Sequence, residues 1–405
     1  MSSQNATVDF KSSIRKPSLG SVNRPITIFT LAIFVLGFFF LGSTVSYKQA
    51  SLYLIAGMLG LALYHAHYGF TSAFRVFLTH GRGVGIRAQM ILFLIANLLF
   101  LPVLMGVFGN QATGYVSPVG MSVLFGAFIF GIGMQIGDGC ASGTLYHLGG
   151  GDSRGLLTLI GFVAGSVIGS AHFTWWMATP NIGPVSFIQT FGVTGGFLFN
   201  LLIMIIVFVV TLYIEKRRNG NVQSLRPDWS AGWKAIYKGP WPLILGSVVL
   251  AVGNALILFI SGKPWGITSA FALWGAKLAQ PFGIQVTNWG YWQTPANAMA
   301  LNNSIFKDVT SVLDIGIILG ALLALGLSGK ANRFWRPMPV RMVAGLLIGG
   351  ILMGYGARIA FGCNIGAYFS GVASFSLHGW VWMVAAMVGS MIGIKLRPVC
   401  KLSNK

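Results

Sequence analysis

Charged residues are scarce in this chain, and acidic ones are the scarcest. Only 8% of its 405 residues are charged, and just 7 are Asp or Glu against 27 Lys or Arg. A soluble domain usually carries about a quarter charged residues, which it needs to cover its surface. The composition therefore excludes a soluble globular protein of this size, and a mean hydropathy of +0.74 agrees with that exclusion.

Cysteine is rare as well, and several familiar motifs are missing. The chain has three cysteines, Cys140, Cys363 and Cys400, without a CxxC pair or a Cys/His metal spacing. A structural zinc site is therefore not expected, nor is any cofactor. The sequence has no Walker motif, so it does not support an ATP-driven mechanism. Cys400 lies in the C-terminal tail after Lys395 and Arg397, where we expect an incidental cytoplasmic thiol.

Apolar residues are abundant, at 55% of the chain, and they form runs long enough to cross a bilayer. The fold class expected is an all-α polytopic membrane protein with about ten spanning helices. The predicted spans are 25–45, 50–68, 86–108, 118–137, 155–177, 193–214, 241–261, 309–328, 341–360 and 375–395. Four Gly-bounded apolar pieces are too short to span and suit re-entrant half-helices. They are Phe70–Thr79, Ala141–Leu148, Ile267–Leu278 and Asn364–Val372.

The net charge of +20 is explained by the positive-inside rule, because the basic residues lie in short loops and tails. It does not indicate a nucleic-acid partner. With both termini cytoplasmic, 22 of the 27 basic residues fall in cytoplasmic segments. An inner-membrane protein with both ends inside is therefore predicted. The expected divisions are a disordered cytoplasmic tail (1–24), an extra N-terminal spanning helix (25–48), a first repeat half with one following helix (49–214), a basic cytoplasmic loop (215–240), a second repeat half (241–397) and a cytoplasmic tail (398–405).

An internal repeat appears when Cys140 is aligned with Cys363. Five glycines then match in one register: Gly126, Gly131, Gly133, Gly139 and Gly143 fall on Gly349, Gly354, Gly356, Gly362 and Gly366. GFTSAF at 69–74 also matches GITSAF at 266–271. The paired spans run in opposite directions in the predicted topology, so the repeat is inverted. Inverted repeats with discontinuous helices are typical of transporters, whose sites lie where the repeats meet. For most of these glycines, close helix packing is the more ordinary role.

The paired cysteines indicate what such a site would bind. A thiol is a soft, polarizable contact, and nearby half-helix N-termini would offer N–H groups to an anion. A lone buried cysteine is more often a small apolar filler, but a symmetric pair favours a site. Arg358 is expected to attract the anion, and Asp138 to be the partner of Arg358 or a proton carrier. The alternatives are a purely structural ion pair and interfacial snorkelling by Arg358. The candidate substrate-binding residues are Cys140, Cys363, Gly139, Gly362, Gly143, Gly366, Arg358, Asp138, Gly69, Thr71, Gly266 and Thr268. Asp314 is a weaker candidate of the same kind.

Three segments carry a resemblance to a known family. FTSAFR at 70–75, GCASGTLYHLGGG at 139–151 and GARIAFGCNIGAYFSG at 356–371 together resemble the YeeE/YedE family of bacterial sulfur-transport proteins. The resemblance implies an hourglass-shaped protein whose cysteines hand an anion inward, often with a small cytoplasmic sulfurtransferase as partner. Cys140 and Cys363 match the family's pattern. Gly69 stands where the family commonly has a third cysteine, and Asp138 where a small residue is usual.

The function expected is uptake of a sulfur-containing anion, thiosulfate first among them, by a transporter or channel that is not an enzyme. A selenium oxyanion or related reduced chalcogen species is the alternative substrate. A membrane-bound sulfurtransferase that forms a persulfide on Cys140 or Cys363 is the alternative from another class.

Overall fold

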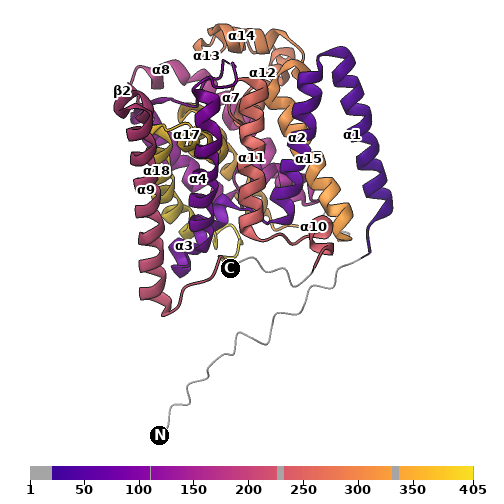
Figure 1. The fold of residues 1–405 in the computed structure, drawn as a ribbon. Coiled ribbons are helices and arrows are strands. Elements are labelled where there is room, and N and C mark those ends of the chain that lie inside the picture. Colours follow the sequence, from indigo (N-terminus) through magenta and orange to yellow (C-terminus); the bar gives the residue numbers. More distant parts are fainter. Residues whose placement is uncertain (1–20, 110, 226–231, 331–336, 405) are drawn as a thin grey trace.

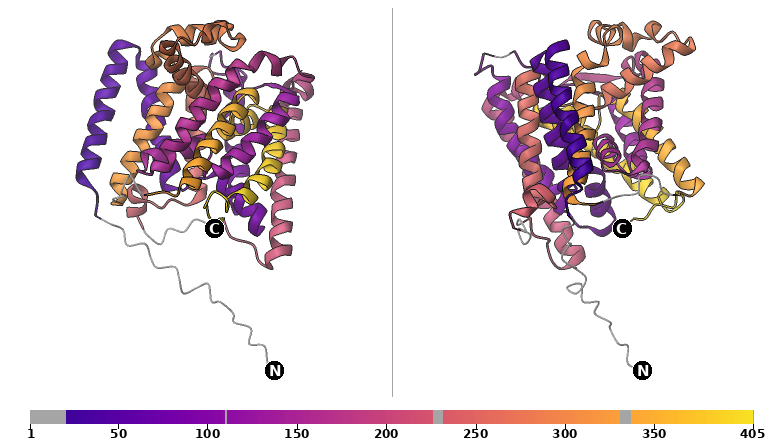
Figure 2. Two further views of the ribbon diagram at one scale, coloured as in Figure 1. Left: turned by 180° about the vertical axis from the view of Figure 1, so that it is seen from behind. Right: turned by 90° about the vertical axis from the view of Figure 1, so that its right-hand side faces the viewer.

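Long helices that run roughly parallel make up most of the molecule (Figures 1 and 2). The computed structural model describes residues 21–109, 111–225, 232–330 and 337–404. Within that part of the chain, ten segments are long and apolar enough to cross a membrane. The long helices are α1 (Arg24–Thr44), α2 (Tyr47–His65), α4 (Val84–Leu104), α5 (Met121–Ile136), α7 (Ser153–Ala171), α9 (Phe187–Asn219), α11 (Leu243–Ser261), α15 (Val309–Ser328), α16 (Val340–Ile359) and α18 (Leu377–Leu396). The prediction of about ten spanning helices is confirmed.

Short helices occupy all four places where half-helices were predicted. They are α3 (Phe70–His80), α6 (Ala141–Gly149), α12 (Thr268–Ala279) and the π-helix η4 (Asn364–Ser370), which continues as α17 (Gly371–Ala373). Each of them follows a long helix within a few residues, as α3 follows α2, α6 follows α5, α12 follows α11 and η4 follows α16. The chain therefore breaks and restarts at these points instead of running through as one helix.

The remaining elements lie at the ends of the bundle. They are α8 (Phe173–Met177), α10 (Lys234–Lys238), η1 (Gln280–Phe282), η2 (Val286–Asn288), α13 (Gly290–Gln293), α14 (Pro295–Asn302), η3 (Ile305–Lys307) and the antiparallel pair β1 (Pro118–Gly120) and β2 (Asn181–Pro184). In Figure 1, α13 and α14 are at one end, whereas α10 and the C-terminus are at the other. The two short strands form a small ribbon that the all-α prediction did not include.

Side-chain caps explain where several long helices begin. Ser46 accepts from the backbone N–H of Gln49, Asp152 from that of Arg154, and Asp308 from that of Ser311. Such caps satisfy N–H groups that the first helical turn leaves unpaired, which matters most where water is excluded. The boundary predicted worst is that of the 193–214 span: α9 runs from Phe187 to Asn219, with a kink at Gly192 (φ 71°).

Helices α1 and α9 lie at the perimeter (Figures 1 and 2). Only 17% of the apolar stretch in α1 and in α9 is buried, as expected for helices that face lipid. Inside, α16 packs against α7 and α5, while α18 packs against α5. On the other side of the bundle, α2 packs against α15 and α11 against α4. The predicted tail 1–24 lies almost entirely outside the described residues, as do parts of the loops at 215–240 and 330–341.

Candidate functional site

The two cysteines predicted to form the site end up in closely matching backbone breaks. After α5, the chain passes through Asp138 in the left-handed region (φ 58°) and reaches Cys140, which directly precedes α6. After α16, it passes through Phe361 (φ 57°) and reaches Cys363, which directly precedes η4. Both cysteines are extended, with φ/ψ of −89°/−171° and −114°/−166°. Each cysteine therefore occupies the N-cap position of a short helix, without a capping hydrogen bond from its thiol.

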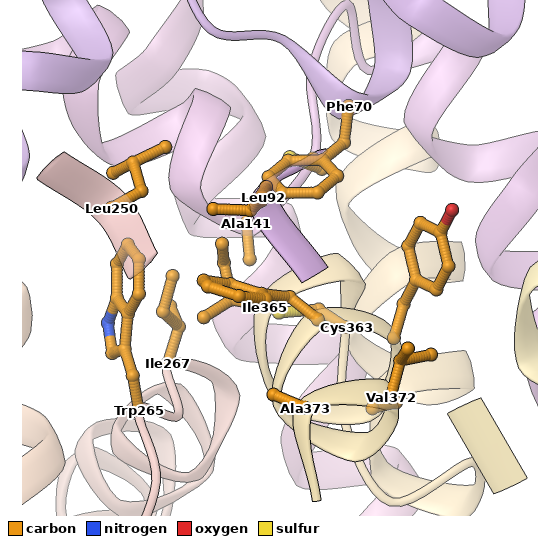
Figure 3. Close-up of a cluster of buried hydrophobic side chains, with 14 of the residues drawn as sticks. Phe70, Leu92, Ala141, Leu250, Trp265, Ile267, Cys363, Ile365, Val372 and Ala373 are labelled. Atoms are coloured by element: carbon orange, nitrogen blue, oxygen red, sulfur yellow. The ribbon is translucent and has the colours of Figure 1, made fainter. Parts of the chain in front are cut away.

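Both thiols are buried among apolar side chains. Cys140 is 2% exposed and Cys363 is 1% exposed, and the two groups are near enough to interact electrostatically. The backbone N–H groups of Ile365 and Gly366 lie near the Cys363 sulfur. Figure 3 shows buried apolar side chains around Cys363, from a cluster that also contains Cys140. We call seven members of this cluster the constriction: Phe70, Leu92, Cys140, Ala141, Ile267, Cys363 and Ile365.

A cavity of about 840 Å³ opens on one side of the constriction. Four of the predicted residues line it: Gly266, Thr268, Arg358 and Gly366. Lys263 and Lys307 add two further positive charges, against the single carboxylate of Asp308, and Asn297 and Asn303 add amide groups. We call this space the basic cavity. A net positive, polar-lined cavity suits a small anion.

Arg358 lies at the buried end of the basic cavity with its guanidinium fixed from two directions. Its Nη2 donates to the Thr268 carbonyl oxygen at 3.0 Å, and its Nη1 donates to the Tyr291 hydroxyl. Its guanidinium carbon also lies 4.6 Å from the centre of the Tyr291 ring. The Nε atom has no hydrogen-bond partner among the described residues. The charge is therefore held in place while one donor remains free.

Gln135 is the residue that the repeat alignment places opposite Arg358. Its side-chain nitrogen donates to the Thr71 carbonyl oxygen at 3.4 Å, just as Arg358 donates to Thr268. Thr71 and Thr268 occupy equivalent positions in the GFTSAF and GITSAF segments. The uncharged amide of Gln135 therefore donates to Thr71 as the guanidinium of Arg358 donates to Thr268.

Asp138 does not pair with Arg358, so the suggested partnership of these two residues is wrong. Its carboxylate binds Arg154 at 2.8 Å and Arg397 at 2.9 Å, with Arg75 at 3.9 Å. In the predicted topology all three arginines belong to cytoplasmic segments. Sequence reasoning missed this grouping because Arg397 is 259 positions away along the chain.

Asp152 shares Arg154 with Asp138. Its Oδ2 lies 2.6 Å from Arg154 Nη2. Burial works to raise the pKa of Asp152, but the hydrogen bonds and charge of Arg154 outweigh it and hold that pKa below its ordinary value. Asp152 therefore stays ionised through the neutral range.

The segment at 69–74 begins α3 beside the first break. Gly69 precedes the helix with φ −110°, and Thr71 is 4% exposed with no hydrogen-bond partner for its hydroxyl among the described residues. A Cβ at Gly69 would lie 2.2 Å from the Ser72 Oγ, which now donates to the Gly69 carbonyl oxygen. A cysteine at 69 would therefore need Ser72 to turn away.

The four glycines that flank the cysteines differ in what they require. Gly362 has φ 140°, which L side chains rarely adopt. A Cβ at Gly139 or Gly143 would meet its neighbours only at 3.6 Å or more, whereas one at Gly366 would lie a tight 3.3 Å from the Tyr115 hydroxyl. Close packing therefore does not explain Gly139 and Gly143, in contrast to the glycines in the middle of α5 and α16.

Three buried asparagines hold η4 and α17 in place, and sequence reasoning missed them. Asn97 donates to the carbonyl oxygens of Val372 and Ala373, each at 3.0 Å. Asn200 donates to that of Val372 at 3.1 Å, and Asn254 to the Ser370 hydroxyl at 3.1 Å. Their signal was an isolated amide in the middle of an apolar run, which in a membrane needs an internal partner.

Asp314, the weaker candidate, is fully buried in α15. Neither of its oxygens has a hydrogen-bond partner among the described residues. It lies near enough to Cys363 to interact with it electrostatically. The structure thus places this carboxyl group close to the constriction without giving it a polar contact.

A family model matches most of this chain, and known proteins match parts of it. The family model described as "Sulphur transport" matches residues 65–392. "Probable transporter YedE" of Escherichia coli K12 is 30% identical over 175 residues, which cover 43% of this chain and 42% of that protein. "Thiosulfate transporter TsuA" of Spirochaeta thermophila is 28% identical over 278 residues, 66% of this chain and 74% of that protein. TsuA of E. coli K12 is 24% identical over 276 residues, 66% of this chain and 72% of that protein.

The family model covers much more of the chain than the YedE relative does. The match to YedE spans about two-fifths of that relative's length, whereas the family match covers both cysteine breaks and all four short helices. The family match does not include α1, which the sequence analysis predicted to be an extra N-terminal helix. Every segment that carried the sequence resemblance lies inside the matched range. The chain therefore belongs to the sulphur-transport family, as a multi-pass membrane protein.

Proposed function

We propose that this protein imports a sulfur-containing anion, thiosulfate first among them, past two buried thiols. The observation that carries the proposal is the placement of Cys363 and Cys140 at the N-cap positions of two short helices inside the constriction. The basic cavity reaches Phe361 and Gly366 on either side of Cys363, while Asp138 and Gly139 lie beside Cys140 on the other side. An anion that enters through the cavity would meet Cys363 first and Cys140 second.

The chemistry of the constriction suits sulfur better than oxygen. The first backbone N–H groups of a helix have no partner within it, so they are available to a negative charge. A thiol adds a weak donor and a polarizable sulfur atom. A terminal sulfur that carries negative charge can use both groups, whereas a hard, strongly hydrated oxyanion would lose more hydration in this apolar cluster. The two TsuA relatives, named as thiosulfate transporters, support this choice of substrate.

The helix packing supports an inverted repeat with a pseudo-twofold axis through the constriction. The pair α5 and α18 corresponds to the pair α16 and α7, and α2 with α15 corresponds to α11 with α4. A Cβ at Gly131 would lie 2.1 Å from the Ala386 carbonyl oxygen, and a Cβ at Gly354 would lie 2.1 Å from that of Phe162. Gly131 and Gly354 are partners in the alignment, and so are Phe162 and Ala386 when the one-residue slip is included.

Substituting these glycines tests the repeat. Gly131→Ala and Gly354→Ala should each lower the unfolding temperature of the purified protein by a similar amount, because each drives a methyl group into a carbonyl oxygen. Overpacking of this kind costs about 1–3 kcal/mol. Gly195→Ala, where a Cβ would meet only its own helix at 3.1 Å, is the matched control. Strongly unequal effects at 131 and 354 would argue against equivalent environments.

The charge distribution supports an orientation with both ends of the chain in the cytoplasm. Helix α1 begins on the same side as the C-terminus, and the basic cavity lies toward the opposite end, near α13 and α14 (Figure 1). Ile182, in the short ribbon at that opposite end, is 71% exposed. In a Cys400→Ser background, Ile182→Cys should react with an impermeant maleimide on intact cells. Reaction only after permeabilisation would reverse the proposed orientation.

Growth on one sulfur source tests the function. A host that lacks its own sulfate and thiosulfate uptake should grow on thiosulfate as sole sulfur source only when it carries this gene. Selenite in excess should slow that growth through this protein only if selenium oxyanions share the path. A persulfide on Cys140 or Cys363, found by mass spectrometry after turnover, would instead favour a sulfurtransferase and a cytoplasmic acceptor for its sulfur.

A further inference from the structure

Three arginines surround the Asp138 carboxylate beside the break between α5 and α6, on the cytoplasmic side in the proposed orientation. Arg154 Nη1 lies 2.8 Å from Asp138 Oδ2, Arg397 Nη2 lies 2.9 Å from Asp138 Oδ1, and Arg75 Nη1 lies 3.9 Å from the same oxygen. The three come from α7, from the end of α18 and from α3. We call this group the arginine cluster. Elements distant in sequence therefore bring their charges to one point beside Cys140.

The arginine cluster carries more positive charge than its carboxylates neutralise. Three guanidiniums face Asp138 and, through Arg154, Asp152. The side chains of Arg75 and Arg397 are only 13% and 3% exposed, and the buried Nε of Arg75 has no hydrogen-bond partner among the described residues. Buried excess charge with an unused donor is costly unless an anion can bind there. The cluster therefore has capacity for an anion beyond the one that Asp138 supplies.

The guanidinium of Arg397 is also held independently of Asp138. Its Nε donates to the Ser403 carbonyl oxygen at 3.0 Å, and its Nη1 donates to that of Gln135. These backbone contacts would keep the donor in position after Asp138 moved away. The site is preorganised rather than created by the carboxylate.

Asp138 occupies the space that such an anion would need. The cavity beside it, lined by Asp138, Gly139, Thr144, His147, Arg154 and Thr158, measures about 10 Å³. That volume holds no more than about one water molecule. An oxyanion can reach the three guanidiniums only if the carboxylate gives up its place. Asp138 lies two residues before Cys140, where an anion leaving the constriction inward would arrive.

We propose that the arginine cluster is an exit site for a divalent sulfur oxyanion and that Asp138 is its built-in competitor. The carboxylate fills the site at rest, yields to the arriving anion, and returns to displace it toward the cytoplasm. This direction of travel rests on the function proposed above. The binding itself does not, because a guanidinium cluster recognises any small divalent oxyanion. Without the competitor, the cluster would retain its ligand.

Sulfate binding to the purified protein in detergent tests the site, with sodium chloride used to match ionic strength. Asp138→Gly removes the carboxylate at a position whose φ of 58° glycine adopts readily, so the fold should be kept. Its apparent Kd for sulfate, measured by calorimetry, should fall about tenfold or more, because a competitor that occupies the site reduces affinity by the fraction it blocks. Adding Arg397→Gln should remove the gain.

Asp152→Asn is the matched control, since it deletes the same charge beside the same Arg154 and keeps a helix-capping residue. It should change the Kd far less than Asp138→Gly. An unchanged Kd in Asp138→Gly, or an equal gain in Asp152→Asn, would overturn the proposal. If Asp138→Gly is not monodisperse, Asp138→Asn decides by the same measurement. The outcome is independent of thiosulfate uptake, so failure of the proposed transport function would be seen separately, in the cysteine variants.

Discussion

Replacing either buried cysteine by serine should abolish thiosulfate uptake, or reduce it to a small fraction, while the protein still folds. A serine hydroxyl is nearly isosteric with the thiol and is a preferred N-cap, so it satisfies the first turn of α6 or η4 at least as well. At Cys363 it would also engage the N–H groups of Ile365 and Gly366 more strongly than sulfur does. The anion would then lose both its soft contact and its free backbone donors. Uptake of ³⁵S-thiosulfate at equal protein level measures the effect.

Cys400→Ser is the internal control for this experiment. Cys400 lies in the tail after α18, against Gly345 and away from the constriction, so its variant should transport normally. Normal growth of both Cys140→Ser and Cys363→Ser on thiosulfate would end the thiol pathway. The anion would then have to be held by backbone N–H groups and Arg358 alone.

Arg358→Gln should lower uptake roughly ten- to hundredfold, which corresponds to loss of one charged hydrogen-bond donor worth about 1.5–3 kcal/mol. The structure itself indicates that glutamine fits, because Gln135 makes the equivalent contact to Thr71 in the other half. The variant should therefore accumulate in the membrane at the wild-type level. The loss should appear mainly as a raised KM, since Arg358 lies in the basic cavity through which the anion enters.

Tyr291→Phe tests how much the Tyr291 hydroxyl contributes to uptake while the positive charge of Arg358 is kept. It removes the hydroxyl that Arg358 Nη1 donates to and keeps the aromatic ring beneath the guanidinium. We expect a loss of uptake smaller than that of Arg358→Gln, because the positive charge remains and Thr268 still holds Nη2. A wild-type KM in Arg358→Gln would show that Arg358 only anchors the end of α12 to α16.

The sequence alone was enough to predict the membrane class, the spanning helices and the places where they break. Apolar runs and glycine-bounded gaps are local signals, so α3, α6, α12 and η4 could be located without the fold. The pairing of Cys140 with Cys363 could be predicted because glycines stand at the same spacings around both cysteines in the sequence. The structure gives both residues the same extended conformation before a short helix.

The partners of the charged groups were decided only by the tertiary structure. The sequence made Asp138 and Arg358 candidates for one pair because both lie just before a cysteine. In the structure Arg358 faces the basic cavity, whereas Asp138 faces the arginine cluster. Which arginines reach Asp138 depends on where the ends of α3, α7 and α18 converge. Apolar runs and helix breaks can be predicted because they are local patterns in the sequence. Ion pairs between residues distant in sequence form only when the helices pack together.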